Sequence, residues 1–175
     1  MRGLSFKLTR LHDTRACMTP FRDYTALVLF IALNAAVSAL GGWATAESVG
    51  TWYVTLNKPP FNPPNWIFAP VWSALYLMIA IAGWRAWRCA TGAQLRLALT
   101  AYAVQLALNL SWSFVFFGAR LIGPALAVIA ALLAAILASA FLFWRIERAA
   151  GALLLPYAAW VCFATLLNAA LWRLN

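Results

Sequence analysis

The sequence predicts an all-α integral membrane protein, a bundle of five transmembrane helices joined by short connections. Hydrophobic residues make up 65% of the 175 residues and charged residues only 10%, whereas a soluble domain of this size is nearer half apolar and a quarter charged. The apolar residues gather in runs of roughly 20, the length that crosses a bilayer as a helix. These runs lack the alternation of polar and apolar residues that is typical of barrel strands.

The chain divides into a basic tail at residues 1–22 and a single membrane domain at residues 23–175. The apolar run that follows the tail is too long for the core of a signal peptide and has no A-x-A-type cleavage site, so we expect the first helix to stay in the membrane. The five runs predict helices at about residues 24–44, 66–87, 95–117, 121–144 and 150–172.

Lysines and arginines between the runs predict the orientation. Ten of them fall in the tail and in the connections between helices two and three and between helices four and five, and three fall on the opposite side. Because positive residues accumulate on the cytoplasmic side, we expect a cytoplasmic N-terminus and an outer C-terminus. Topology therefore explains the net charge of +9 better than nucleic-acid binding. Alanine- and arginine-rich usage is compatible with a bacterial cell membrane.

The stretch from Gly50 to Tyr76 joins the first two predicted helices and is rich in tryptophan and proline. A loop that is aromatic along its length and stiffened by proline suits a lid over an apolar cavity or a plate on the membrane surface. The polar residues inside helices three and five favour the lid. Its expected contacts with the polar edge of a ligand are Trp52, Tyr53 and Lys58.

Three tryptophans, Trp72, Trp112 and Trp160, are predicted to lie one to three turns inside the helices rather than at their ends. An indole N–H needs a hydrogen-bond partner when it is buried, so an interior tryptophan often marks a polar pocket or a ligand contact.

Amide side chains share helix faces with these indoles. Gln105 and Asn109 fall four residues apart in the third predicted helix, and Trp160, Ala164 and Asn168 recur every four residues in the fifth, so each set lies on one face. Two interpretations stay open. The amides tie helices together by hydrogen bonds, or they form the floor of a ligand cavity walled by indoles.

Several chemistries are excluded by what the sequence lacks. The single histidine, His12, lies in the tail, which excludes a histidine-ligated haem or metal inside the membrane, and no metal site is predicted. No acid or base falls deep inside a predicted helix, which argues against an ion-coupled transporter. No Ser/His or Cys/His pair is available for nucleophilic catalysis.

Small residues at every fourth position line two of the predicted helices. The rows are Gly123, Ala127, Ala131, Ala135 and Ser139 in the fourth helix and Ala103, Ala107 and Ser111 in the third. Such rows let helices approach closely, within a bundle or between subunits. We expect a homodimer that uses one of the two rows.

Three groups of residues carry a resemblance to a known family, and the resemblance covers essentially residues 24–175. They are Trp52-Tyr53, Leu56, Lys58-Pro59, Pro63-Pro64, Trp66, Pro70-Val71-Trp72 and Leu75-Tyr76; then Gln105-Leu106, Asn109, Trp112 and Phe116-Phe117-Gly118; then Pro156-Tyr157, Trp160, Ala164-Thr165, Asn168 and Trp172-Arg173. The pattern resembles the translocator protein family, also called tryptophan-rich sensory proteins (TspO/MBR) or peripheral-type benzodiazepine receptors.

The resemblance implies a five-helix bundle, usually dimeric, with a cavity that the first loop closes and that binds porphyrins such as protoporphyrin IX. Many members also bind sterols and benzodiazepine- or isoquinoline-type drugs. By position, the residues that resemble lid and wall contacts are Tyr53, Pro63, Asn109, Trp112, Ala164 and Leu167. Trp72 and Trp160 resemble two cavity tryptophans tied to light-dependent breakdown of protoporphyrin in some bacterial members, and they would be catalytic only if this protein has that activity. Ala169 stands where the family's sterol-recognition pattern has an aromatic residue, which argues against high-affinity sterol binding.

We therefore expect a membrane protein that binds a tetrapyrrole and acts in porphyrin handling and stress regulation. The alternatives are a light-dependent porphyrin-degrading oxidase and a transporter of porphyrins or sterol-like amphiphiles. No tightly bound cofactor is expected, and a metal-free porphyrin as ligand or substrate is favoured over haem because no histidine is available to bind iron.

Overall fold

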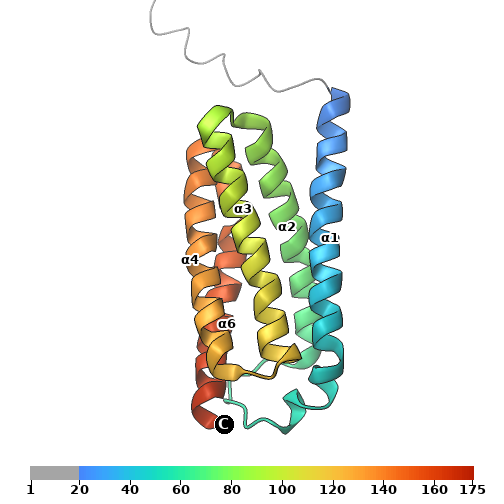
Figure 1. The fold of residues 1–175 in the computed structure, drawn as a ribbon, viewed down its shortest axis with the longest axis vertical. Helices are drawn as coiled ribbons and strands as arrows, with labels where there is room; N and C mark the ends of the chain where they lie inside the picture. The colour runs from blue at the N-terminus through green and yellow to red at the C-terminus, as the bar shows by residue number, and fades with distance from the viewer. Residues whose placement is uncertain (1–19) are drawn as a thin grey trace, which may run out of the picture.

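The computed structural model describes the backbone of residues 20–175 and the side chains of residues 23–175. Within this part, five helical segments are long and apolar enough to cross a membrane, as the sequence predicts. α1 (Pro20–Gly50), α2 (Phe68–Cys89), α3 (Gly92–Ser113) and α4 (Ile122–Ile146) run alternately down and up the bundle, and α5 (Arg148–Ala152) leads into α6 (Leu155–Leu174) (Figure 1). The predicted basic tail lies outside the described residues except for residues 20–22, which begin α1.

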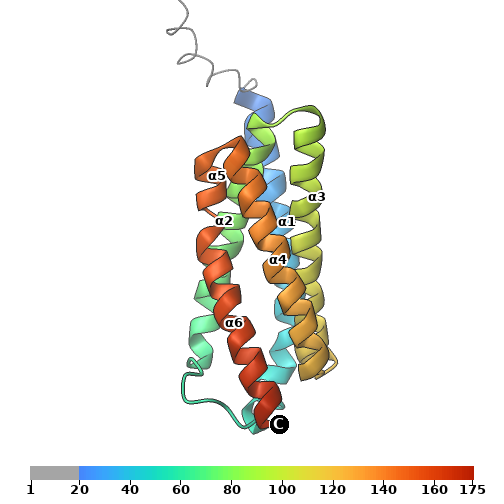
Figure 2. The same cartoon turned by 90° about the vertical axis from the view of Figure 1, so that its left-hand side faces the viewer.

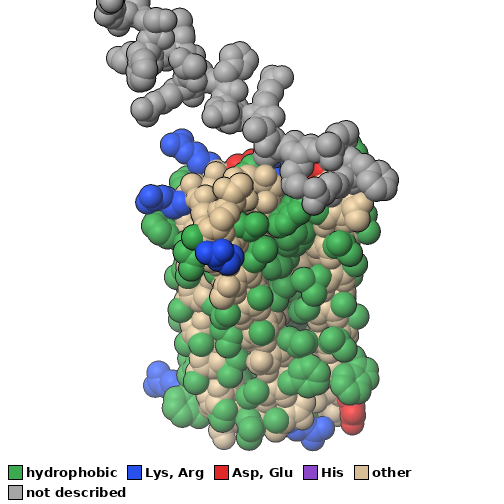
Figure 3. Space-filling view, turned by 45° about the horizontal axis from the view of Figure 1, so that its top comes forward, with side chains coloured by type: hydrophobic (Ala, Val, Ile, Leu, Met, Phe, Trp, Pro, Cys, Tyr) green, Lys and Arg blue, Asp and Glu red, His purple; other side chains and the backbone are tan. Residues whose placement is uncertain are grey.

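The helices close into a ring around one core. α1 lies beside α2 and α3, α4 lies beside α3 and α6, and α2 meets α5 and α6 (Figures 1 and 2). Apolar side chains cover the waist of the face seen in Figure 3, and its lysines and arginines lie toward the ends. This distribution suits a bundle whose middle faces lipid and whose ends meet water.

α1 continues to Gly50, six residues past its predicted end at residue 44. Polar side chains in its last turns bond back to the protein instead of to water. Thr45 Oγ1 donates to the carbonyl of Gly41 at 2.7 Å, and Ser48 Oγ donates to the carbonyl of Phe117 at 2.7 Å. Because these groups are satisfied locally, the polar composition of this stretch does not end the helix.

The third span changes helix type before it ends. α3 stops at Ser113 and continues as a π-helical turn, η3 (Phe114–Gly118). In this wider turn the N–H of Ala119 donates to the carbonyl of Phe114 at 2.7 Å. Such turns occur mostly as single insertions within α-helices and are frequent at functional sites, and η3 forms part of the cavity wall described below.

The fifth span is broken between α5 and α6. Pro156 lies in the first turn of α6, where its missing N–H costs nothing, whereas it could not continue the helix from α5. Gly151 lets α5 fold back closely on the end of α4. A Cβ atom on Gly151 would lie only 2.7 Å from the backbone nitrogen of Trp144.

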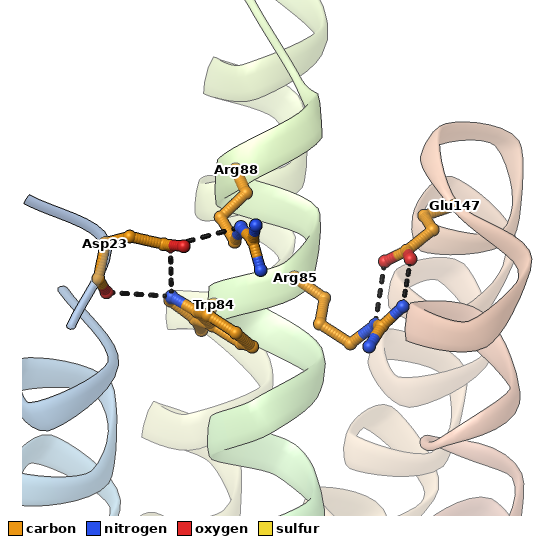
Figure 4. Close-up of polar contacts among 5 residues, drawn as sticks. All are labelled: Asp23, Trp84, Arg85, Arg88 and Glu147. Atoms are coloured by element: carbon orange, nitrogen blue, oxygen red, sulfur yellow. Dashed lines mark hydrogen bonds and ion pairs between the residues drawn. The ribbon is translucent and has the colours of Figure 1, made fainter. Parts of the chain in front are cut away.

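Two charged clusters fasten the end of the bundle at which α1 begins (Figure 4). Asp23 of α1 accepts from Trp84 Nε1 at 3.0 Å and pairs with Arg88 Nε at 3.1 Å. Arg85 Nε donates to Glu147 Oε2 at 2.9 Å, and a second guanidinium nitrogen contacts the other carboxylate oxygen. These contacts link α2 to α1 on one side and to the α4–α5 connection on the other.

Candidate functional site: a cavity beneath the first loop

A cavity of about 450 Å³ lies between the helices at the end of the bundle covered by the first loop. We call residues 51–67 the lid loop; it contains the short helical turns η1 (Tyr53–Thr55) and η2 (Asn65–Ile67). α1, α2, α3, η3 and α6 all contribute to the wall. Its aromatic members are Tyr53, Phe68, Trp72, Tyr76, Trp112, Phe116, Phe117 and Trp160. A cavity of this size and lining suits a flat apolar ligand.

The aromatic rings of the wall hold one another in place. Trp112 stacks on Phe116, with ring centroids 5.3 Å apart and planes 25° apart. Phe68 meets Trp160 edge to face at 6.0 Å. Contacts of this kind stabilise ring positions beyond simple burial, so the two sides of the cavity present rings in defined orientations.

The amide side chains of the wall form hydrogen bonds with other side chains of the protein. Tyr76 Oη donates to Asn109 Oδ1 at 2.6 Å, and Asn109 Nδ2 donates to Tyr157 Oη at 2.8 Å. Trp112 Nε1 donates to Asn168 Oδ1 at 3.1 Å. Asn109 and Asn168 therefore do both things that the sequence left open: they line the cavity, and their hydrogen bonds tie helices together.

Trp160 differs from Trp112. Its Nε1 is buried and has no hydrogen-bond partner among the described residues, although the side chain lines the cavity. A buried indole N–H without a partner costs free energy. Trp160 therefore presents its ring to the cavity, whereas its N–H is not exposed there.

Tyr53 belongs to the lid loop and lines the cavity beneath it. It is only 4% exposed, and its hydroxyl donates to Asn62 Oδ1 at 2.6 Å. Burial raises the pKa of Tyr53 to about 12, so the hydroxyl stays protonated at neutral pH and remains a donor. The ammonium group of Lys58 lies 5.1 Å from the centre of the Tyr53 ring, within the range of a cation–π contact.

Four of the residues predicted to touch ligand do not line the cavity. Trp52 packs edge to face on Phe116 with centroids 5.6 Å apart, and Lys58 donates to loop carbonyls, including that of Leu56 at 3.1 Å. Pro63 accepts from Asn62 at 3.0 Å through its carbonyl. Gln105 is buried deeper in the bundle, and neither polar atom of its side chain has a partner among the described residues.

The other eight predicted residues all lie on the cavity wall: Tyr53, Trp72, Asn109, Trp112, Trp160, Ala164, Leu167 and Asn168. Sequence reasoning missed the wall that α1 contributes, which includes Gly41, Gly42 and Ala46. Glycine and alanine carry no chemical signal of a site, although Gly41 leaves room for Ser113, whose Oγ would lie 3.4 Å from an added Cβ atom. Within residues 23–175, no three His, Cys, Asp or Glu side chains gather as metal ligands would.

Residues 30–173 match the TspO/MBR family. The chain belongs to this family. It is 40% identical over 150 residues to the tryptophan-rich protein TspO of Archaeoglobus fulgidus, covering 85% of this chain and 96% of that protein. It is 36% identical over 151 residues to protein CrtK of Rhodobacter capsulatus, covering 86% and 94%. It is 37% identical over 145 residues to the translocator protein of Sus scrofa, covering 79% and 86%. Membership fits an integral membrane protein with a sensory or translocator role.

Proposed function

We propose that the protein binds protoporphyrin IX or a related metal-free tetrapyrrole in this cavity and acts in porphyrin handling and stress regulation. The observation that carries the proposal is a cavity whose wall holds eight aromatic side chains, Trp72, Trp112 and Trp160 among them. Flat rings suit the faces of a macrocycle. The polar edge of the ligand would lie toward the lid loop, where Lys58 brings a positive charge. Drugs of the benzodiazepine and isoquinoline type would use the same wall.

Tryptophan emission tests this proposal. Protoporphyrin added to the purified protein in nanodiscs is expected to quench emission at concentrations up to about 10 μM. Trp160→Phe replaces the indole of the wall by a smaller ring and is expected to weaken binding by roughly tenfold, the effect of losing about 1.4 kcal/mol of ring contact. Trp144→Phe, an exposed position on α4 away from the cavity, is the matched control. No quenching of the native protein in this range would sink the proposal.

A second function, light-dependent oxidation of the bound porphyrin, is favoured by Trp72 and Trp160 lining one cavity. Indoles beside an excited porphyrin are oxidisable electron donors, so such chemistry would need no acid–base residue. The reaction would consume dioxygen and give a ring-opened product. Illumination in air is then expected to produce bilin-like absorbance that requires the protein and disappears in Trp160→Phe. Bleaching without a new absorbance band would count against it.

Transport of the amphiphile across the membrane is the third possibility. Uptake of protoporphyrin into sealed vesicles that contain only this protein would support transport, and binding without uptake would favour a sensor or scavenger.

We further propose a cytoplasmic location for the end of the bundle where α1 begins. Arg85 and Arg88 at the end of α2, Arg145 at the end of α4 and Arg148 in α5 lie at that end, as positive residues do on the cytoplasmic side. The lid loop would then face the outside. Labelling of Asn57→Cys by a membrane-impermeant thiol reagent in intact cells, in a background without the native cysteines, tests this orientation.

A further inference from the structure

The cavity has one exposed edge, and it lies between α1 and α2. Among the cavity-lining residues that the structure describes, those exposed at the surface are Gly42, Ala46, Asn65, Ala69 and Ser73. α3, η3 and α6 contribute only buried or half-buried residues to the wall. We call Gly42 and Ala46 of α1 and Ala69 and Ser73 of α2 the α1/α2 mouth.

The side chains of the mouth are all small, so the helices leave space between them. At Gly42 an added Cβ atom would find no heavy atom of another part of the chain within 4 Å. Gly42 lies eight residues before the end of α1 at Gly50, which is ~12 Å along the helix axis. Ala69 lies four residues into the second span, which begins at Asn65, or ~6 Å. The mouth therefore opens into the outer part of one leaflet rather than into water.

In contrast to the mouth, the route to the cavity beneath the lid loop is closed. Tyr53 is buried beneath the loop, and the loop is bonded to the C-terminal end of α6. The backbone N–H of Asn57 donates to Asn175 Oδ1 at 2.9 Å, and Asn175 Nδ2 donates to the carbonyl of Asn57 at 3.1 Å. These bonds must break before the loop can lift from the cavity.

A second cavity, of about 360 Å³, continues the mouth along the same two helices. It shares Ser38, Ser73 and Tyr76 with the main cavity and reaches Asn34 deeper in α1. Asn34 is 1% exposed, and its Oδ1 has no partner among the described residues. The space between α1 and α2 therefore extends beyond the mouth toward the middle of the membrane.

We propose that ligands reach the cavity sideways from the bilayer, through the α1/α2 mouth, and that the protein takes amphiphiles dissolved in lipid rather than in water. This inference rests on the proposed binding function. A planar molecule with anionic groups on one edge partitions with that edge among the headgroups and its apolar body among the upper acyl chains, which is the depth of the mouth. The lid loop then closes one end of the cavity and need not open at each binding event.

Stopped-flow quenching of tryptophan emission by protoporphyrin in nanodiscs tests the route. Gly42→Phe fills the mouth and is expected to slow both association and dissociation by roughly tenfold, because a blocked passage acts on both directions. Gly50→Phe is the matched control, since Gly50 is also free of neighbours within 4 Å, lies on the same helix and does not line the cavity. Asn175→Ala, which removes both bonds to the backbone of Asn57 and so unfastens the lid loop, is expected to leave both rate constants unchanged.

Two kinetic results would overturn the inference. Unchanged rates in Gly42→Phe together with faster rates in Asn175→Ala would place the route under the lid loop. Faster dissociation alone in Gly42→Phe would make Gly42 a wall contact and not part of a passage.

A measurement without porphyrin separates this inference from the proposed function. Phospholipids brominated in the upper part of their acyl chains quench tryptophan on contact. Lipid chains that reach the mouth are expected to quench part of the Trp72 emission in the native protein and in Gly50→Phe, and this part should be lost in Gly42→Phe and in Trp72→Phe. Equal quenching in all four proteins would overturn the lateral route even if porphyrin binds. If porphyrin fails to bind the native protein, the proposed function falls, and the brominated lipids still decide whether the mouth is open to the bilayer.

Discussion

Asn57 and Asn175 hold each other in a reciprocal pair across 118 residues of sequence, with N···O distances of 2.9 and 3.1 Å. Asn57 Nδ2 also donates to the carbonyl of Leu174 at 3.3 Å. Because the backbone of Asn57 takes part in two of the three bonds, the position of the lid loop depends on the end of α6. We expect Asn175→Ala to speed hydrogen exchange in the lid loop and to lower the free energy of unfolding by about 1–2 kcal/mol, because it removes both bonds to the backbone of Asn57. Asn57→Ala removes only the bond to Leu174 and should have the smaller effect. Equal exchange rates in Asn175→Ala and in the native protein would show that the pair does not hold the loop.

Arg85 and Glu147 form a half-buried ion pair between α2 and the α4–α5 connection. Partial exposure keeps its contribution small, and Arg85→Ala is expected to lower the free energy of unfolding by about 1 kcal/mol. Exchanging the charges in Arg85→Glu/Glu147→Arg should recover part of that loss. Arg96→Ala, at an exposed position on α3, is the control. Equal destabilisation by Arg85→Ala and Arg96→Ala in urea unfolding would count against a role for the pair.

Gly151 is expected to tolerate no side chain. A Cβ atom would lie 2.7 Å from the nitrogen and 2.8 Å from the Cα of Trp144, and backbone atoms cannot rotate away as a side chain can. Gly151→Ala should therefore destabilise the protein by about 1–3 kcal/mol. Gly42→Ala, in open space on α1, should be neutral or stabilising because alanine favours helix. Thermal unfolding of the two variants side by side is the measurement, and equal midpoints would contradict this view of the α4–α5 contact.

The lid loop is expected to lose stability in alkali because of Tyr53. Burial raises the pKa of its hydroxyl from 10.0 to about 12. Below pH 10 the phenol is neutral in both states and has no effect. Between about pH 10 and about 12 it ionises only in the unfolded chain, so the folded state loses up to roughly 2–3 kcal/mol. Tyr53→Phe removes this component. The difference in unfolding free energy between the two proteins should change across that pH range, and a difference independent of pH would contradict the burial effect.

The predicted homodimer can be tested on its two candidate rows. Ala103, Ala107 and Ser111 of α3 are all exposed. On α4, by contrast, Ser139 is fully buried and Gly123 lies against Trp172. We therefore expect the contact between subunits to use α3. Ala107→Leu should weaken dimerisation in detergent by roughly tenfold, and Ala131→Leu should not, as measured by analytical ultracentrifugation. The opposite pattern would assign the contact to α4.

The sequence was sufficient for the fold because five long apolar runs leave few alternatives in a membrane. Helical periodicity also placed Trp160, Ala164 and Asn168 on one face, and all three line the cavity. The same periodicity gives the face of a residue but not its depth. Gln105 shares a face with Asn109, yet the cavity reaches only Asn109.

The remaining differences between the predicted and the observed cavity wall come from contacts that no local sequence pattern predicts. Lys58 donates to the carbonyls of Val54 and Leu56 in its own loop instead of lining the cavity. The α1 wall consists partly of Gly41, Gly42 and Ala46, whose contribution is space rather than chemistry. The space that these small residues leave can be recognised only once the position of the opposite helix is known.

The directions in which the aromatic rings of the cavity wall point depend on the number of residues in the π-helical turn η3. Each residue of an α-helix turns the chain by ~100°, so one residue more or fewer in this turn redirects the side chains on one side of it relative to those on the other. Phe116 and Phe117 belong to the turn, and Trp112 precedes it. Removing Ser113 or Val115 would keep every ring in the sequence and change the direction in which the rings after the deletion point relative to Trp112. Alignments that place a gap here would therefore mark relatives with a differently shaped cavity, whatever their tryptophan content.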